Sequence, residues 1–413
     1  PYSSELARAQ EGNVKSKDKY SYIRKLMSDE FTGDSSHAKD LLNQFVWSFE
    51  KYFMRNEHDY YILFAPVKYW KSVGLMKKTF VDGFLANRGN FKAQESSVLV
   101  AQWKNEVDTI TESLTVPAKE IWKDDKKWGT GKGAAVIDVP EDAILKDVKH
   151  VTIRKVYKTL GEYYSKKVKA DVLSKIATGY DGREVPLKSY GKPVYNDNIL
   201  AVIEASGFGT TPQDIRMTRI AIYHGRGSQV RTTNYAEQTA LFVAKQYPQR
   251  NWYERDIYYT TADKGDLYKK DINFLRKSTL WTCISQKNHC LSFHGSDGKF
   301  YNNEMCLDEN SLVRKELVEQ EKYGKLDRAD LMLLGVFDEL LELVKDTQEY
   351  NPEYNYGTYQ IELEINTSYK DSNDKKIFNN EKVNTKLKEL KKRLAEYYEN
   401  ELESKLFEYE LLK

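Results

Sequence analysis

The most chemically suggestive stretch of the chain is HGRGSQVR, residues 224–231. Its glycines favour a turn with free backbone N–H groups, and such groups beside a guanidinium are suited to bind phosphate. Arg226, Gln229 and Arg231 also carry the side-chain groups that read base edges in a DNA groove. These residue types therefore predict contact with DNA. The alternative is a turn that is held by internal hydrogen bonds only.

A second basic stretch covers residues 148–170 and contains Lys166, Lys167 and Lys169. Clustered lysines neutralise phosphates without reading sequence, so this stretch is a candidate for contact with the DNA backbone, and a solvated helix face is the alternative. Because the net charge is only +2, nucleic-acid binding would depend on such local clusters. The 30 Tyr residues, many beside Lys, Arg or Asn, suit base stacking, although an AT-rich genome would favour the same residues.

Other kinds of chemistry have weaker support in the sequence. Cys283, Cys290 and Cys306 lack the short chelating spacing of zinc modules, and the His and Asn residues around them lack the acidic partner of an HNH nuclease. The glycines of WGTGKGAAVID (128–138) follow no apolar strand, and no Ser or Thr follows Lys132, so neither a P-loop nor a dinucleotide turn is indicated. We also find no acidic-acidic-Lys set of the kind that nucleases use.

The elements that would position these residues are clearest in the first hundred residues. Residues 40–54 have amphipathic helical spacing, and DYYILFAP (59–66) predicts a short strand that is buried on both faces. A second helix is expected over 67–78, followed by two strands over 79–91 and 96–105. This order fits the second half of a doubly wound sheet that ends in an antiparallel hairpin. We expect the three strands to share one sheet, with the last strand antiparallel.

The ordered set of segments in residues 1–105 resembles the catalytic half of the gamma-type N6-adenine DNA methyltransferases of restriction-modification systems. In that family a catalytic Asn-Pro-Pro-Tyr tetrapeptide precedes these elements, and Pro1 and Tyr2 would be its last two residues. The family flips an adenine out of the duplex and stacks it on the Tyr ring, which implies a stacking role for Tyr2. An aromatic residue of the hairpin would cover the other face of the base, with Trp103 as the closest match and Phe91 as the second.

The resemblance also implies S-adenosylmethionine as the methyl donor and duplex DNA as the substrate. In this motif order, the elements that bind the methyl donor precede the tetrapeptide. We therefore expect this chain to be inactive alone and to need a separate N-terminal methyltransferase half as its partner. The alternatives are a non-catalytic nucleic-acid-binding or interaction module and, with less support, a nuclease subunit.

The predicted fold class is α/β: the C-terminal half of a doubly wound methyltransferase sheet with a β-hairpin end, a mixed α+β recognition region and a helical C-terminal region. The expected boundaries are 1–110, 111–326 and 327–413. The last region contains an apolar helix over 328–347 and a long helix over 380–413 with a regular apolar stripe. The three cysteines are too few for a disulfide framework, and no apolar run reaches the roughly 18 residues of a membrane span. We therefore expect a cytoplasmic protein without membrane contact.

Overall fold

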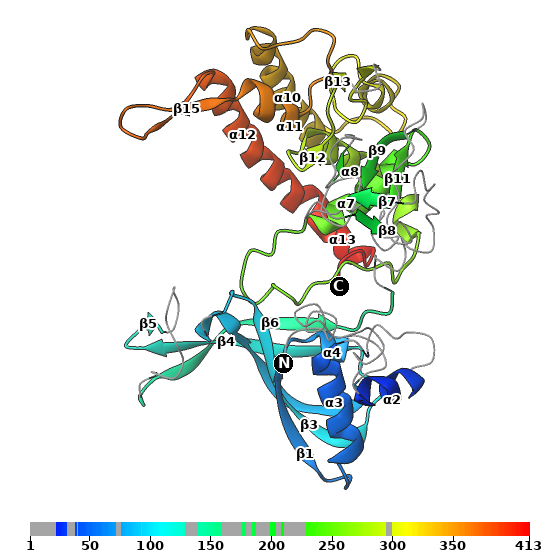
Figure 1. Ribbon diagram of the computed structural model, residues 1–413, viewed down its shortest axis with the longest axis vertical. Helices are drawn as coiled ribbons and strands as arrows, with labels where there is room; N and C mark the ends of the chain where they lie inside the picture. The colour runs from blue at the N-terminus through cyan, green and yellow to red at the C-terminus, as the bar shows by residue number, and fades with distance from the viewer. Residues whose placement is uncertain are drawn as a thin grey trace. The chain divides into compact units, whose positions relative to one another are not determined.

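The computed structural model describes residues 22–30, 38, 40–71, 76–91, 93–128, 139, 141–158, 160, 176–178, 184–186, 199–203, 208–209, 228–294 and 300–413. The chain forms two compact units (Figure 1). The first unit comprises Pro1–Tyr157, Pro248–Tyr259 and Lys413, and the second comprises Lys158–Tyr247 and Thr260–Leu412. This division differs from the expected boundaries after residues 110 and 326, because the sheet of the first unit continues past residue 110.

The first unit contains a mixed six-stranded sheet with the order β1-β3-β2-β4-β5, in which β6 also pairs with β4. Its strands are β1 (Tyr60–Ala65), β2 (Lys78–Asn87), β3 (Ser97–Val107), β4 (Ser113–Lys123), β5 (Lys126–Lys127) and β6 (Ile144–Arg154). Strand β3 lies between β1 and β2 and is antiparallel to both, whereas β2 and β4 are parallel. The expectation that the first three strands share one sheet, with the last strand antiparallel, is confirmed.

Short helices accompany this sheet: α2 (Tyr22–Glu30), α3 (Leu41–Tyr52), α4 (Lys68–Lys71) and the 3-10 turn η2 (Arg88–Asn90). The predicted helix over 40–54 is confirmed as α3. It begins after Asp40, whose carboxylate accepts a hydrogen bond from the Leu42 N–H at 3.0 Å. Of the predicted apolar stripe, Leu42 and Val46 are buried, but Phe45 and Phe53 are 56% and 67% exposed. Only part of the stripe therefore faces the core.

The core of the first unit lies on one face of the sheet, and α2, α3 and α4 contribute to it. Alternate residues of β3 and β4 point into this core, among them Leu99, Ala101 and Val116. Trp252, from the segment Pro248–Tyr259, also belongs to the core and donates a hydrogen bond from Nε1 to Glu120 Oε1 at 2.7 Å. The segment Pro248–Tyr259 is therefore anchored in the first unit.

Strand β1 differs from its prediction. Leu63 and Ala65 are buried on the core side, but Tyr60 and Ile62 are 51% and 72% exposed on the opposite face. The expectation of burial on both faces is wrong, because β1 is an edge strand and the described helices of this unit cover only one face of it. An apolar run shows that a strand is hydrophobic, but it does not show whether one face or both faces of the strand are buried.

The second unit combines a four-stranded sheet of order β11-β9-β10-β12, three two-stranded pairs and a set of helices. Its strands are β7 (Ile176–Thr178), β8 (Glu184–Pro186), β9 (Ile199–Ile203), β10 (Phe208–Gly209), β11 (Ser228–Arg231), β12 (Asn288–His289), β13 (Phe293–His294), β14 (Phe300–Tyr301), β15 (Ser368–Lys370) and β16 (Lys376–Phe378). Its helical segments are α7 (Tyr235–Lys245), η5 (Leu267–Lys270), α8 (Ile272–Ile284), α9 (Leu312–Arg314), η6 (Lys315–Glu319), α10 (Arg328–Lys345), α11 (Thr358–Gln360), η7 (Ile361–Ile365), α12 (Glu381–Tyr397), η8 (Tyr398–Leu402) and α13 (Glu403–Glu408).

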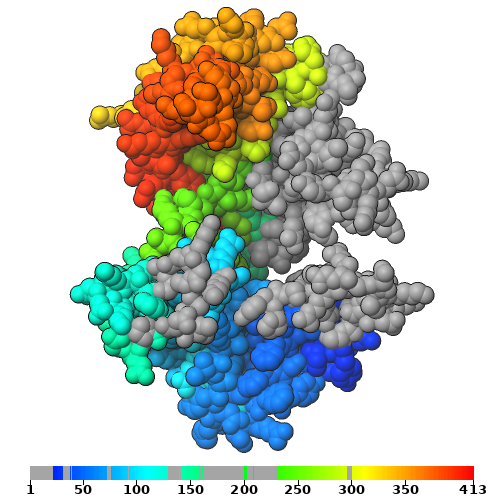
Figure 2. Space-filling view, turned by 60° about the vertical axis from the view of Figure 1, so that its left-hand side comes forward, coloured from blue at the N-terminus to red at the C-terminus, as the bar shows by residue number. Residues whose placement is uncertain are grey.

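The helical C-terminal region of the prediction is confirmed. Helix α10 matches the expected apolar helix, and α12, the π-helical turn η8 and α13 together form the expected long one. The apolar stripe of α12, including Val383, Leu387 and Leu390, is buried. Figure 2 shows this region, orange to red, as one continuous surface. None of the helices in the described ranges is long and apolar enough to cross a membrane.

Candidate functional site

The candidate site lies where β1 and β2 end. Both strands are antiparallel to β3, so they run in the same direction, and Ala65 and Leu85 both pair with Leu99. Their carboxyl ends therefore meet at one edge of the sheet, which we call the carboxyl edge. In open α/β sheets, ligands bind outside the carboxyl ends of such strands. We therefore expect functional side chains at the carboxyl edge.

The turn after β2 is held rigidly at this edge. Asn87 Oδ1 accepts a hydrogen bond from the Gly89 N–H at 2.8 Å and thereby caps η2. A Cβ atom at Gly89 would lie 2.9 Å from Glu95 Cγ, so a larger residue would require the Glu95 side chain to move. Arg255 Nη1 donates to the Glu95 carbonyl at 3.2 Å, which ties the turn to the segment Pro248–Tyr259. The residue that follows η2, Phe91, therefore has a defined position.

Two aromatic rings form the exposed part of the carboxyl edge. Phe64, near the end of β1, and Phe91, directly after η2, are 39% and 49% exposed. Their ring centroids are 5.1 Å apart at an interplanar angle of 77°. Exposed rings at a fixed position offer a surface on which a planar ligand can stack. Phe91 was predicted from the sequence; Phe64 was missed, although the alternation in YYILFA places it on the same face as Tyr60 and Ile62.

Two buried polar atoms lie in the same turn. Asn90 and Ser96 are only 5% and 6% exposed, and neither Asn90 Oδ1 nor Ser96 Oγ has a hydrogen-bond partner among the described residues. A buried polar group without a partner costs roughly 1–3 kcal/mol. Core residues such as Trp103 also carry such atoms, so the two atoms do not by themselves mark a site. Both atoms have almost no exposed surface, so a ligand would reach them only if the turn opened.

Trp103, the closest match in the sequence to the aromatic residue of the hairpin that covers the base, is a core residue instead. Its side chain has no exposed surface, and its ring packs edge-on against Tyr69 and Phe80, with centroids 6.0 Å and 5.5 Å away. Trp103 shares the inward face of β3 with Leu99 and Ala101, because alternate residues of a strand point to the same side. A fully buried ring cannot stack on a base. Phe91 is therefore the better candidate of the two.

The other predicted site residues belong to segments that the structure describes only in part. Pro1, Tyr2, Lys166, Lys167, Lys169 and Arg226 lie outside the described residues. Gln229 and Arg231 are in β11, which pairs with β9, and the Arg231 N–H donates to Asn234 Oδ1 at 2.7 Å. Ser228 and Gln229, predicted to be part of the glycine-containing turn, are thus in a strand, and contact of Gln229 and Arg231 with DNA stays a prediction.

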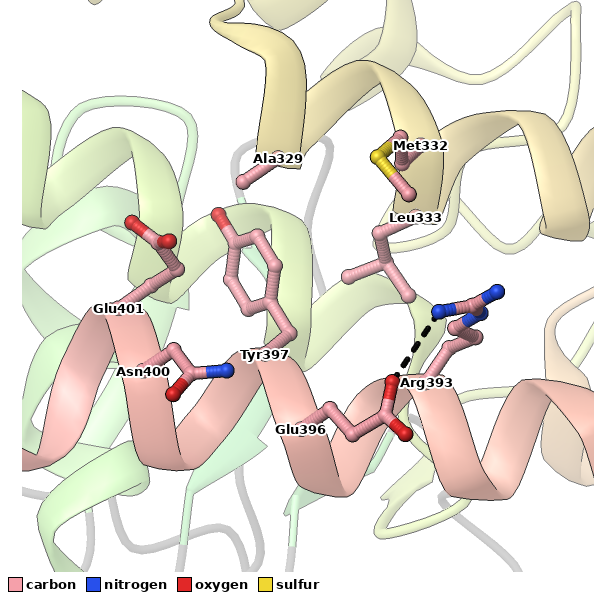
Figure 3. A pocket seen from close by; sticks show the side chains of 8 residues that line it. All are labelled: Ala329, Met332, Leu333, Arg393, Glu396, Tyr397, Asn400 and Glu401. Carbon is pink, nitrogen blue, oxygen red and sulfur yellow. Dashed lines mark hydrogen bonds and ion pairs between the residues drawn. The ribbon is translucent and has the colours of Figure 1, made fainter.

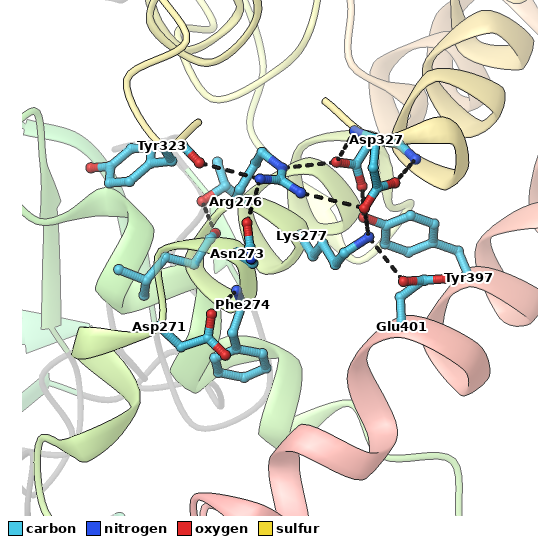
Figure 4. A network of polar contacts seen from close by, with 12 residues as sticks. Asp271, Asn273, Phe274, Arg276, Lys277, Tyr323, Asp327, Tyr397 and Glu401 are labelled. Carbon is cyan, nitrogen blue, oxygen red and sulfur yellow. Dashed lines mark hydrogen bonds and ion pairs between the residues drawn. The ribbon is translucent and has the colours of Figure 1, made fainter. Parts of the chain in front are cut away.

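A partly buried charge cluster lies in the second unit (Figure 4). It consists of Arg276, Lys277, Asp327, Asp330, Tyr397 and Glu401, and we call it the α8–α10 network. Arg276 Nε pairs with Asp330 Oδ2 at 2.8 Å, and Lys277 Nζ donates to Asp327 Oδ2 at 2.6 Å. Burial raises the pKa of Asp327, but the hydrogen bonds from Lys277 and from the Asp330 N–H outweigh it, so this pKa lies below its usual value. Each charged group of the network has a partner, which is typical of a structural cluster.

A pocket with a cavity volume of about 170 Å³ lies beside this network (Figure 3). Its lining residues are Ala329, Met332, Leu333, Arg393, Glu396, Tyr397, Asn400 and Glu401. Glu396 pairs with Arg393 at 3.2 Å and Glu401 pairs with Lys277 at 2.9 Å, so both carboxylates already have cationic partners. The pocket is therefore a weaker candidate than the carboxyl edge.

The cysteines do not form a metal site in the described part of the chain. Cys283, Cys290 and Cys306 are buried and are not joined in disulfides, and burial raises the pKa of Cys283. A thiol that resists ionisation is a poor metal ligand. No group of three or more His, Cys, Asp or Glu residues among those described is arranged to hold a metal ion.

Comparisons of the chain with models of known protein families, with curated proteins and with solved structures give no match. The class of the protein therefore follows from its own structure: a mixed α/β protein with a helical C-terminal region.

Proposed function

We propose that the chain is part of a restriction-modification DNA methyltransferase that transfers a methyl group from S-adenosylmethionine to adenine N6 in duplex DNA. The observation that carries this proposal is the arrangement of β1, β3 and β2, with the reversed strand in the middle and an exposed Phe91 at the hairpin turn. The resemblance to the methyltransferase family predicts that these three strands share one sheet, with the last strand antiparallel. The first unit would supply base-pocket and DNA-recognition elements.

The outer edge of strand β1 supports the proposal that a separate N-terminal half binds the first unit. Strand β1 pairs on one side with β3, and on its other side with no strand among those described. Its outward residues Tyr60, Ile62 and Phe64 form an apolar row that is 51%, 72% and 39% exposed. An edge strand with an apolar face is a site for pairing with another strand. In the proposed enzyme, an N-terminal half with the cofactor-binding loop would extend the sheet at β1 and cover this row.

In this proposal, the carboxyl edge holds the flipped adenine. Phe91 would stack on the base, and Phe64, whose ring is nearly perpendicular to that of Phe91, would support the Phe91 ring. The resemblance assigns stacking on the opposite face of the base to Tyr2. The methyl donor would be held by the N-terminal half, and we expect no binding of S-adenosylmethionine by this chain alone.

The test is methyl transfer from labelled S-adenosylmethionine to duplex DNA. The chain is assayed alone and after co-expression with the residues encoded directly upstream of Pro1. We expect activity only in the second case, and Phe91→Ala should lower it roughly tenfold or more, because base stacking contributes about 1–3 kcal/mol. Phe53→Ala is the matched control, since Phe53 is also an exposed aromatic residue of the first unit but lies at the C-cap of α3. Micromolar binding of the methyl donor by the isolated chain, measured by calorimetry, would contradict the proposal.

The burial of Trp103 favours the second candidate, a non-catalytic nucleic-acid-binding module, because it removes one of the aromatic residues expected to contact the base. This candidate predicts that both preparations bind DNA and that neither transfers a methyl group. It also predicts that Phe91→Ala and Phe53→Ala change the affinity for DNA by the same amount.

A further inference from the structure

Strands β4 and β6 form a long antiparallel ribbon with two different faces. On one face, Leu114 and Val116 of β4 and Val151 and Ile153 of β6 are buried in the core of the first unit. On the other face, Ser113 lies opposite Arg154, Thr115 opposite Thr152, and Pro117 opposite His150. We call these six residues the donor face. Five of them carry side-chain groups that can donate a hydrogen bond, and none is a carboxylate.

The donor face is open to solvent. Ser113, Thr115, His150 and Arg154 are exposed, and Thr152 is half-buried. The Thr115 and Thr152 hydroxyls are hydrogen-bonded to each other at 3.0 Å, which aligns the two strands at the centre of the face. In Figure 2 the region of these strands, in cyan and turquoise, reaches the surface of the molecule.

The charges of the donor face differ from those at the far end of the same ribbon. There, the lysines are paired with carboxylates: Lys119 with Asp147 at 2.7 Å and Lys146 with Asp125 at 3.3 Å. Arg154, in contrast, has no ion pair with any described residue. Arg154 therefore gives this face one positive charge, and none of the six residues of the face is a carboxylate that would neutralise it.

We propose that the donor face binds the phosphate backbone of duplex DNA. Residues two apart on one strand are roughly 6.6 Å apart, so His150, Thr152 and Arg154 extend over roughly 13 Å. This is the axial length of about four nucleotides of one DNA strand. Hydroxyl and guanidinium groups are common donors to phosphate oxygens, and they position a protein on DNA without reading sequence. An apolar partner does not suit this face, since Pro117 is its only apolar side chain.

This inference rests on the proposed function in one respect only, the assignment of duplex DNA as the substrate. It would give the first unit its own contact with the substrate, separate from the carboxyl edge. The contact can therefore be tested without the methyl donor and without methyl transfer.

The experiment measures the affinity of the full chain for a mixed-sequence DNA duplex by fluorescence anisotropy over a series of salt concentrations. Arg154→Gln should weaken binding roughly tenfold at 50 mM salt and reduce the slope of log K against log salt by about 0.9, the value for one lost phosphate contact. Arg154→Lys should restore most of the affinity. Lys146→Gln is the matched control, because it removes one positive charge from the same strand but outside the donor face.

Several results would overturn the inference. Equal losses for Arg154→Gln and Lys146→Gln would mean that net charge, and not this face, determines binding. Unchanged binding by Arg154→Gln at an unchanged melting temperature would exclude the contact. Equally tight binding of an acidic polypeptide would show a general anion site. If Arg154→Gln weakens DNA binding as expected but the chain co-expressed with the upstream residues transfers no methyl group, the inference stands and the methyltransferase proposal fails.

Discussion

Glu50 of α3 illustrates how a single residue can link the stability of the first unit to pH. It is largely removed from solvent, and the Tyr61 hydroxyl donates to Glu50 Oε1 at 2.9 Å. Burial raises the pKa of Glu50 to about 7, against the smaller lowering effects of Tyr61 and Lys78. The folded state therefore keeps a proton that the unfolded state releases above the ordinary pKa of 4.5.

We predict that the free energy of unfolding falls as the pH rises from 4.5 to about 7, by on the order of 2–3 kcal/mol, and then levels off. Glu50→Gln imitates the protonated carboxyl group and should remove most of this dependence. Urea denaturation at pH 5 and pH 8 measures the effect, with the exposed Glu141→Gln as a control. If the Glu50→Gln chain shows the same loss between these pH values as the unmodified chain, another group is responsible.

At the scale of elements, the α8–α10 network joins four helical segments of the second unit, α8, α10, α12 and η8. Asp330 is fully buried, accepts from Arg276, Lys277 and the Tyr397 hydroxyl, and forms a capping box with Asp327 at the start of α10. Removing one partner of a buried charge cluster leaves the others without compensation, which costs far more than the loss of a surface pair.

Asp330→Ala should therefore lower the free energy of unfolding by about 3–5 kcal/mol. Glu396→Ala removes a surface pair with Arg393 and should cost less than about 1 kcal/mol. Chemical denaturation followed by circular dichroism compares the two variants. Similar small losses for both would show that the buried cluster does not hold α8, α10 and α12 together.

At the scale of the whole molecule, the apolar row on β1 has the largest consequence for assembly. Ile62 is 72% exposed, so its replacement removes no core packing. Ile62→Lys should leave the melting temperature nearly unchanged and should reduce both self-association and co-purification with the upstream half, because a charged residue on an edge strand opposes strand addition. Size-exclusion chromatography measures both effects. Thr79→Lys on β2 is a control for the added charge. If the Ile62→Lys chain still co-purifies with the upstream half, that half does not bind at β1.

The sequence by itself determined the local elements of this protein. The spacing of apolar residues predicted α3, α10 and the long helix that begins at α12, and the apolar and alternating runs predicted β1, β2 and β3. These patterns are local, because helix and strand periodicity depend on neighbours a few residues away. Even the shared sheet of the three strands could be predicted, since short connections leave few ways to pair them.

Only the tertiary structure decided which side chains are available at the site. Trp103 and Phe91 are both aromatic residues of the hairpin, yet one is fully buried and the other 49% exposed, because strand register and the covering helices set the exposure of each position. The partners of Arg276 in the α8–α10 network come from 51 and 54 residues along the chain. The donor face likewise requires the pairing of β4 with β6, which fixes opposite partners such as Ser113 and Arg154. Such contacts form between segments that are far apart in the sequence, and a local sequence pattern contains no information about them.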